Sequence, residues 1–163
     1  MAGKKEAEKT RATTKRSETL NGRHPGLNKL LGYHLRMAHV KVFQDFRQRL
    51  GSFEITPAHL GILLVVEQNS DISQTDLSQT MRMDRSALVG IIDKLEKKGW
   101  IKRGKTATDR RRNELRLTPK GEALLEKLWP SVEAHEAGIV EGLTEKEQET
   151  LFHLLSKVGQ APQ

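Results

Sequence analysis

The 163-residue chain contains no cysteine, and this absence excludes several kinds of chemistry at once. Without cysteine there is no disulfide, no thiolate nucleophile, no zinc site built on cysteine and no cysteine-based redox sensor. The longest apolar run, Ile62 to Val66, is far shorter than the roughly 20 residues that a membrane-spanning helix needs. The N-terminal residues lack the apolar stretch of a signal peptide. We therefore expect a cytoplasmic protein with no membrane partner.

Aromatic residues are also scarce, at 4% of the chain. Single-strand binding proteins stack bases on aromatic side chains, so the composition argues against that class. The six histidines show no metal-ligand spacing, and neither a Ser/His/Asp set nor a pair of carboxylates stands out. The sequence thus predicts a protein that is not an enzyme and holds no metal or cofactor.

Positive charge is abundant and unevenly distributed. The net charge is +7, and residues 1–26 carry seven Lys/Arg against three Glu. Residues 102–116 carry seven Lys/Arg against Asp109 and Glu114, whereas residues 120–157 carry four basic and eight acidic groups. Such a concentration of basic residues indicates that one part of the protein meets a polyanion. A solvated basic loop is the alternative on charge alone.

Apolar periodicity and capping residues predict a mainly α, α+β chain. We expect a long amphipathic helix from Leu27 to near Gly51, and helices opened by Thr56-Pro57, Ser73, Asp84, Thr118-Pro119 and Thr144. Pro130 should kink the helix that contains it. Two alternating stretches, residues 100–103 and 113–117, predict two short antiparallel strands around a basic tip. The element order is four helices, a two-stranded ribbon and two helices.

Residues 73–117 combine two capped helices with a basic ribbon, which is the pattern of a winged helix-turn-helix. An α-helix fits the major groove of duplex DNA, where its N-terminal residues reach the base edges. The apolar stripe of the second helix is Leu88, Ile91, Ile92 and Leu95, which leaves polar residues near its start facing outward. The predicted DNA-binding residues of the two helices are Ser73, Gln74, Arg82, Asp84, Arg85, Ser86 and Val89. Ordinary surface residues on a core helix would show the same pattern.

The tip of the ribbon supplies three further candidates: Asp109, Arg110 and Arg111. An arginine on a short extended wing can enter a narrow minor groove, where the potential is most negative. Asp109 stands beside the guanidinium groups and can orient one of them by an ion pair. A mobile charged hairpin is the alternative.

Residues 77–125 resemble the MarR family of bacterial winged-helix repressors. The similarity lies in Asp93-Lys-Leu-Glu-Lys-Lys-Gly99, in Asp109-Arg-Arg111 and in Leu117-Thr-Pro-Lys-Gly121. The helix order extends it to residues 27–158. The resemblance implies a homodimer on a pseudo-palindromic operator, with Arg111 as the wing arginine and Asp109 as its partner. The arginine-rich tip and the basic tail depart from the family pattern, and the tail would add nonspecific DNA affinity.

The apolar stripes also favour a dimer, because the first helix and the acidic C-terminal helices are more apolar than a small winged-helix core requires. The predicted organisation is a disordered basic tail (1–26), an N-terminal dimerisation helix and linker (27–56), a DNA-binding region (57–117) and C-terminal dimerisation helices (118–163). Two-fold symmetry would then place two recognition helices one helical turn of DNA apart.

A small-molecule effector is a separate prediction, because members of this family bind anionic aromatic acids or their thioesters. Tyr33, Arg36, His39 and Phe43 on the first helix are the candidate ligand-binding residues. Arginine would bind a carboxylate or phosphate, and the aromatic side chains would contact a ring. A role in the dimer interface or in solvent is the alternative.

One motif is misleading. Residues 99–106 match the phosphate-binding pattern GxxxxGK[ST], but that loop requires a strand before it and a helix after it. Here a helix precedes and a ribbon follows, which argues against an NTPase. Two hypotheses remain: a dimeric, ligand-released repressor, and an architectural protein that binds DNA of any sequence through its tail and wing. Sequence preference in DNA binding separates them.

Overall fold

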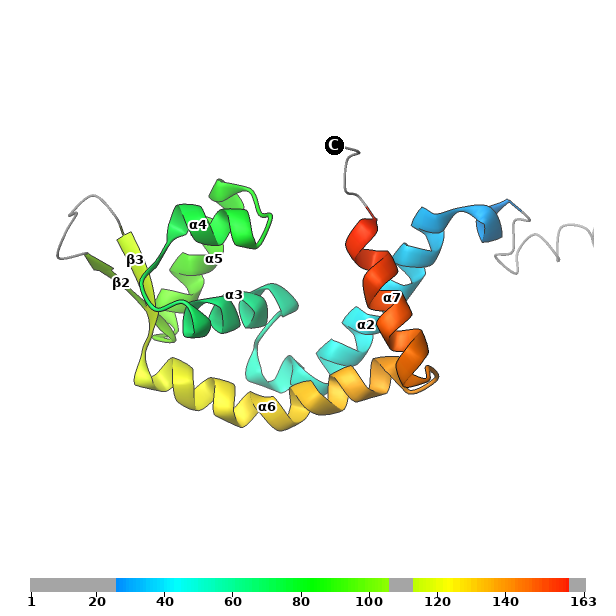
Figure 1. The fold of residues 1–163 in the computed structure, drawn as a ribbon. Coiled ribbons are helices and arrows are strands. Elements are labelled where there is room, and N and C mark those ends of the chain that lie inside the picture. The colour runs from blue at the N-terminus through cyan, green and yellow to red at the C-terminus, as the bar shows by residue number, and fades with distance from the viewer. Residues whose placement is uncertain (1–25, 106–112, 159–163) are drawn as a thin grey trace, which may run out of the picture. The chain divides into compact units, whose positions relative to one another are not determined.

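A computed structural model of the protein describes residues 26–105 and 113–158. The chain divides into two compact units, Met1–Val42 and Phe43–Gln163. The helices and strands are drawn in Figure 1. In chain order they are η1 (Leu27–Lys29), α2 (Leu31–Leu50), η2 (Gly51–Phe53), α3 (Pro57–Gln68), β1 (Ile72–Ser73), α4 (Gln74–Thr80), α5 (Arg85–Lys97), β2 (Ile101–Lys105), β3 (Asn113–Leu117), α6 (Pro119–Val140) and α7 (Glu145–Lys157).

The first unit holds little of the core. A 3₁₀ turn, η1, precedes α2, so the α-helix begins at Leu31 rather than at the predicted Leu27. The His34 ring nitrogen Nε2 lies 3.0 Å from the Asn28 carbonyl oxygen and ties the turn to the helix. Within residues 26–42 no residue is buried. The stability of this unit therefore depends on α2 being continuous with the second unit.

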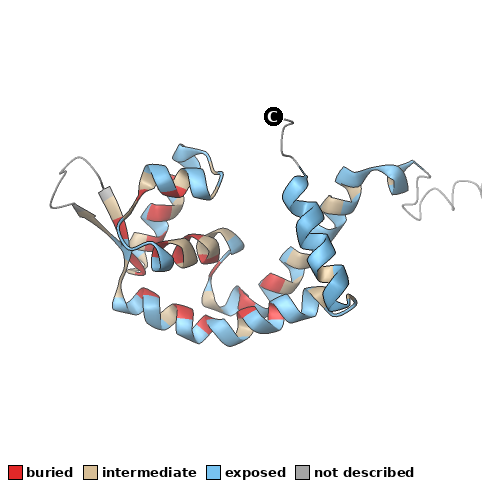
Figure 2. Cartoon of the chain, in the orientation of Figure 1, coloured by how far each residue is buried: buried red, intermediate tan, exposed pale blue. Residues whose placement is uncertain are grey.

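The second unit contains the hydrophobic core, to which α3, α5, the sheet and one side of α6 contribute (Figure 2). Leu88, Ile92 and Leu95 form the fully buried stripe of α5, while Ile91 is only partly buried, contrary to the prediction. The buried residues of α6 recur every three or four positions from Gly121 to His135. This spacing places one face of a long helix along the core.

The sheet has three strands in the order β1-β3-β2, all antiparallel, and not the two that were predicted. The extra strand pairs Ile72 with Leu115 and Ser73 with Glu114. A two-residue strand carries too little periodicity to be found in a sequence, and it forms because the chain passes β3 on its way into α4. The winged-helix fold is confirmed, with this strand added.

Pro130 does not interrupt α6, which runs as one helix from Pro119 to Val140 (Figure 1). The predicted kink therefore does not divide this segment into two helices. Pro130 lies on the exposed face, where water can bind the carbonyl group that loses its amide donor. Among the described helices, no single one is long and apolar enough to span a membrane, and only one bent pair reaches that length together.

A partly buried polar link joins the end of α2 to α6. The Asp45 carboxylate accepts hydrogen bonds from Arg49 Nε at 2.9 and 3.0 Å and lies 2.6 Å from His135 Nδ1. The hydrogen bond from His135 and the bonds from Arg49 hold the pKa of Asp45 below its ordinary value. His135 is buried and packs edge-on against Phe46. These contacts therefore fasten the C-terminal end of α2, from Phe43 onward, to α6.

α3 begins with a capping box that uses histidine in place of the usual acidic residue. The Thr56 hydroxyl accepts the His59 amide at 3.2 Å, and His59 Nδ1 accepts the Thr56 amide at 3.3 Å. Only a ring with an unprotonated Nδ1 can accept that bond. Burial, followed by the charges of Lys98 and Lys94, holds the pKa of His59 below its ordinary value.

This cap predicts a stability that falls on acidification. Because the folded-state pKa of His59 is lowered, the unfolded chain binds more protons as the pH drops through about 6.5, and the free energy of unfolding decreases. Lowering the pH from 7.5 to 5.5 should reduce the free energy of unfolding of the wild type more than that of His59→Gln. The extra reduction should be at most about 1 kcal/mol, which is the typical contribution of a helix cap. Urea unfolding at both pH values measures it. A pH-independent difference would contradict the role of this ring.

Candidate DNA-binding surface

The first helix of the helix-turn-helix is tied to the sheet by its cap. Ser73 ends β1 and is also the N-cap of α4. Its hydroxyl oxygen accepts the Asp76 amide at 3.1 Å and donates to the Asp76 carboxylate at 2.6 Å. Ser73 is buried, so its hydroxyl positions α4 rather than facing outward, and Gln74 beside it is half-buried.

The turn between α4 and α5 is closed by reciprocal bonds between Ser78 and Met83. The Met83 amide donates to the Ser78 carbonyl oxygen at 3.0 Å, and the Ser78 hydroxyl donates to the Met83 carbonyl oxygen at 2.8 Å. Inside this turn Arg82 has a φ of 47°, in the left-handed region that favours glycine. Among the described residues Glu54 and Asp71 also have a positive φ, so what distinguishes Arg82 is that it places an exposed cation directly before α5.

The second helix, α5, starts at an Asp84 cap. The Asp84 carboxylate accepts the Ser86 hydroxyl at 2.5 Å and the amides of Ser86 and Ala87 at 2.8 and 3.4 Å. The Ser86 hydroxyl, followed by the two amides, lowers the pKa of Asp84, so the carboxylate stays ionised. Asp84 is therefore an element of the helix start, and its charge is already engaged by donors of α5.

The outward side of this helix start is polar and open. Arg82, Arg85 and Ser86 are exposed, and Val89 is half-buried. A Cβ built on Gly90 would meet nothing within 4 Å, so the surface next to Val89 is free for close approach. The core-facing stripe of α5 lies on the other side of the helix. The predicted residues Arg82, Arg85, Ser86 and Val89 thus lie together at one helix terminus.

The wing is fastened to α5 by an arginine that sequence reasoning did not single out. Arg103 on β2 forms ion pairs with Asp93 and Glu96 of α5, and its amide donates to Glu96 at 3.2 Å. On β3, Arg116 pairs with Asp71, which precedes β1. The partners of both arginines show that these side chains position the ribbon. Alternation along β2 places Arg103 on the same face as the buried Ile101, and this was the available signal for Arg103. Arg116 lies on the opposite face, so alternation gives no such signal for it.

The tip of the wing, with Asp109, Arg110 and Arg111, lies outside the described residues, as does the basic segment 1–25. The strands that carry the tip are in register from Ile101 opposite Leu117 to Lys105 opposite Asn113. β2 follows the end of α5, and β3 leads into the start of α6 (Figure 1). The GxxxxGK[ST] match begins at Gly99 after α5 and runs along β2, which is the reverse of the strand-to-helix order of a phosphate-binding loop.

Arg103 gives a testable distinction between positioning and contact. Arg103→Met should lower the free energy of unfolding by about 1 kcal/mol, since the side chain is partly exposed and its ion pairs are screened. It should weaken DNA binding about fivefold without changing the slope of log affinity against log salt, because no phosphate contact is lost. Lys102→Met on the same strand is the control and should leave unfolding unchanged. Equal loss of stability in both variants would contradict this role.

The candidate effector residues lie on α2 at helical spacing. Tyr33 is half-buried and packs edge-on against His34, while Arg36, His39 and Phe43 are exposed. Positions 33, 36 and 43 differ by three and seven residues, so they share a face of the helix. Within the described ranges, no cluster of three or more histidine or acidic side chains is arranged to hold a metal ion.

Comparisons with known proteins identify the fold. Residues 53–112 match the family model described as MarR family. A protein of Thauera aromatica assigned as transcriptional regulator of the hcr operon is 35% identical over 129 residues, which cover 78% of each chain. The chain belongs to the MarR family. This confirms the predicted family, its winged-helix fold and the class of transcriptional regulators.

Three solved structures, two of CouR and one of BpsR, are similar to this chain over nearly their full length. The transcriptional repressor CouR on a 23-mer DNA duplex is 32% identical, with a TM-score of 0.80, over 85% of this chain and 98% of that one. CouR bound to p-coumaroyl-CoA has a TM-score of 0.78. BpsR of Bordetella bronchiseptica, whose DNA binding is regulated by 6-hydroxynicotinic acid, is 26% identical, with a TM-score of 0.76, over 82% of this chain and 95% of that one.

Proposed function

We propose that this MarR-family protein is a cytoplasmic homodimeric repressor that binds a pseudo-palindromic DNA operator and is released by an aromatic acid or its thioester. The observation that carries the proposal is the open, basic start of α5, where Arg82 and Arg85 lie beside Ser86 in a capped helix-turn-helix. It acts by binding, without catalysis. The repressor CouR, seen both on DNA and with p-coumaroyl-CoA, supports each half of the proposal.

The operator is read by two parts of each protomer. Arg82, Arg85, Ser86 and Val89 enter the major groove, with Gln74 at the start of α4 beside them. Asp109 orients Arg111 for the minor groove, and Arg110 adds phosphate affinity. Ser73 and Asp84 contribute through the helix starts that they cap. Residues 57–117 form this DNA-binding region.

The dimer is formed by residues 27–56 and 118–163. No residue of α7 is buried in the single chain, although five of its residues, counting the C-cap, are large and apolar: Leu151, Phe152, Leu154, Leu155 and Val158. Phe152 is the most exposed of these five residues, at 62%. An apolar patch of this kind marks an interface, and a two-fold axis then spaces the recognition helices for successive major grooves.

The effector binds the face of α2 that carries Tyr33, Arg36, His39 and Phe43. Arg36 supplies the positive charge for a carboxylate or phosphate, and Tyr33 and Phe43 supply apolar contacts for a ring. Its binding favours a spacing of the recognition helices that no longer matches the operator. A few kcal/mol of differential affinity between the two arrangements suffices.

The test is selection of bound duplexes from a random library at two salt concentrations, with wild type and Arg111→Ala. The proposal expects one inverted repeat with half-sites about 10 base pairs apart, weakened by the substitution. Absence of a motif, with affinity that collapses as salt rises, would instead support an architectural protein that binds any sequence. p-Coumaroyl-CoA is then added to the complex, with free CoA as control. The effector site is supported if p-coumaroyl-CoA releases the wild-type protein from the DNA and fails to release Arg36→Ala.

A further inference from the structure

A groove runs between α3 and α6, apart from the helix-turn-helix and the proposed effector face. One part has a volume of about 260 Å³ and is lined by Leu64, Glu67, Leu125, Glu126 and Trp129. A second part of about 300 Å³ adjoins it at Glu67 and extends towards β3. The first part is mainly apolar and open to solvent, so a small ligand could enter it and contact its apolar lining.

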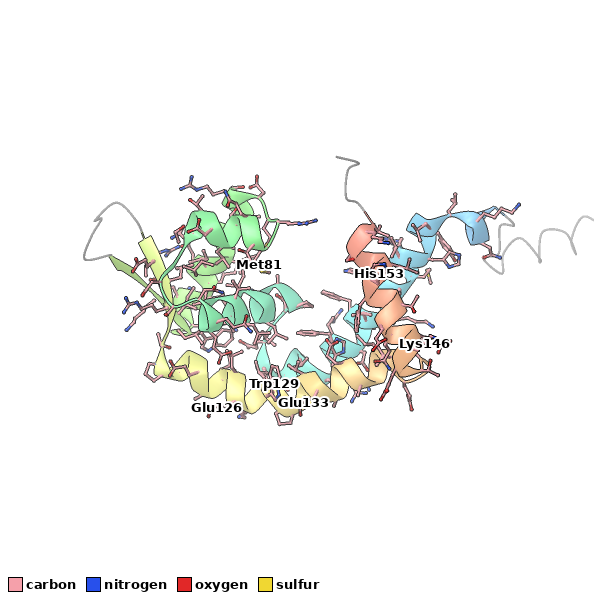
Figure 3. All side chains as sticks on the ribbon, viewed as in Figure 1. Met81, Glu126, Trp129, Glu133, Lys146 and His153 are labelled. Carbon is pink, nitrogen blue, oxygen red and sulfur yellow. The ribbon has the colours of Figure 1, made fainter. Side chains whose placement is uncertain are left out.

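Trp129 forms an aromatic wall of this pocket. Its side chain is 46% exposed, whereas the other tryptophan, Trp100, is 7% exposed. The Trp129 indole N–H donates to Glu133 at 2.9 Å, one helical turn further along α6. Figure 3 shows Glu126, Trp129 and Glu133 following one another along α6. The hydrogen bond restricts the ring, and nearly half of the residue's surface stays accessible to a ligand.

The charge around the ring is negative and uncompensated. Glu67 and Glu126 line the pocket, and neither has an ion-pair partner in the described part of the chain. The nearest lysine along α6, Lys127, lies over the Phe53 ring at 5.7 Å. Arg116, at the far end of the groove, is paired with Asp71. An anionic aromatic acid would be repelled here.

We propose that the Trp129 pocket binds an organic cation, an ammonium group carried on a small apolar body. The face of an indole ring attracts a cation through its quadrupole, and quaternary ammonium ligands are recognised in this way. Glu67 and Glu126 supply the opposite charge from α3 and α6, while Leu64 and Leu125 contact the apolar part. None of the five lining residues is among those proposed to contact the effector or the DNA.

The experiment uses the full-length protein and choline as the probe. Tryptophan fluorescence is titrated with choline chloride, with sodium chloride at equal ionic strength, and with 3,3-dimethylbutan-1-ol, the neutral isostere of choline. Because Trp100 is buried, a change in emission reports Trp129. A saturable change with choline alone is expected. Equal responses to choline and the neutral alcohol, or none to either, would overturn the proposal.

Charge substitutions complete the test. Glu126→Gln and Glu67→Gln should each weaken choline binding about fivefold, and Trp129→Leu, followed by calorimetry, should abolish it. Glu149→Gln, an exposed substitution on α7, is the matched control and should bind like wild type. Melting temperatures verify that each variant is folded. Binding unchanged in both pocket glutamate variants, or weakened as much in the control, would assign the fluorescence change to a nonspecific effect and overturn the site.

Discussion

Gly121→Ala is expected to lower the free energy of unfolding by about 3 kcal/mol, the upper range for overpacking a core. A Cβ on Gly121 would lie 2.1 Å from the Trp100 carbonyl oxygen and 3.0 Å from its carbon. Both are backbone atoms, so no side-chain rotation relieves the clash. The same oxygen accepts the Thr118 amide at 3.0 Å, and the Thr118 hydroxyl caps α6 through the Gly121 amide.

The substitution therefore separates the start of α6 from the start of β2. The contact between Gly121 and Trp100 holds the base of the wing, β2 and β3, against α6. We therefore expect DNA affinity to fall together with stability. Urea unfolding at one fixed protomer concentration measures the loss, since dimer stability depends on concentration.

Gly90→Ala is the control for the chemical change. It adds the same methyl group inside a helix where nothing lies within 4 Å. There the higher helix propensity of alanine should raise the free energy of unfolding by about 0.5–1 kcal/mol. Overpacking a core usually costs about 1–3 kcal/mol. A smaller loss in Gly121→Ala would mean that the contact between Gly121 and Trp100 opens easily and does not hold the wing.

Arg85→Ala is expected to weaken operator binding by about 10- to 100-fold, the range for an arginine that contacts a base pair. Arg85 is exposed at the first position of α5, where a positive charge opposes the helix dipole. Its removal should therefore leave the free energy of unfolding unchanged or slightly higher. Fluorescence anisotropy with the selected operator measures the affinity, and thermal unfolding measures stability.

Arg82→Gly sharpens this prediction because its two effects have opposite signs. Glycine relieves the left-handed backbone at a φ of 47°, so stability should rise by up to about 1 kcal/mol, while loss of the guanidinium should weaken operator binding about tenfold. Arg47→Ala, an exposed charge on α2, controls for net charge. A loss of affinity in Arg47→Ala equal to that in Arg82→Gly and Arg85→Ala would point to bulk electrostatics rather than to base contacts.

Helix starts were predictable because capping joins residues only two or three positions apart. Thr56, Ser73, Asp84, Thr118 and Thr144 are all N-caps in the structure, as predicted. The apolar stripes of α5 and α6 follow from helical spacing in the same way. The placement of Arg82 and Arg85 at one helix start also follows from local sequence. Local geometry thus accounts for the helix-turn-helix and for most of its outward face.

The contacts that hold the wing were decided by tertiary structure. Ile72 pairs with Leu115 across more than forty residues of chain, and Arg103 reaches Asp93 and Glu96 only because β2 folds back along α5. The role of Gly121 likewise depends on how closely Trp100 approaches α6. Contacts between residues distant in sequence depend on how several elements pack together, so no short-range sequence pattern predicts them. The family, the helices and the surface charge could therefore be predicted from the sequence, whereas packing sets Arg103 and Arg116 to position the wing and leaves Arg82 and Arg85 exposed.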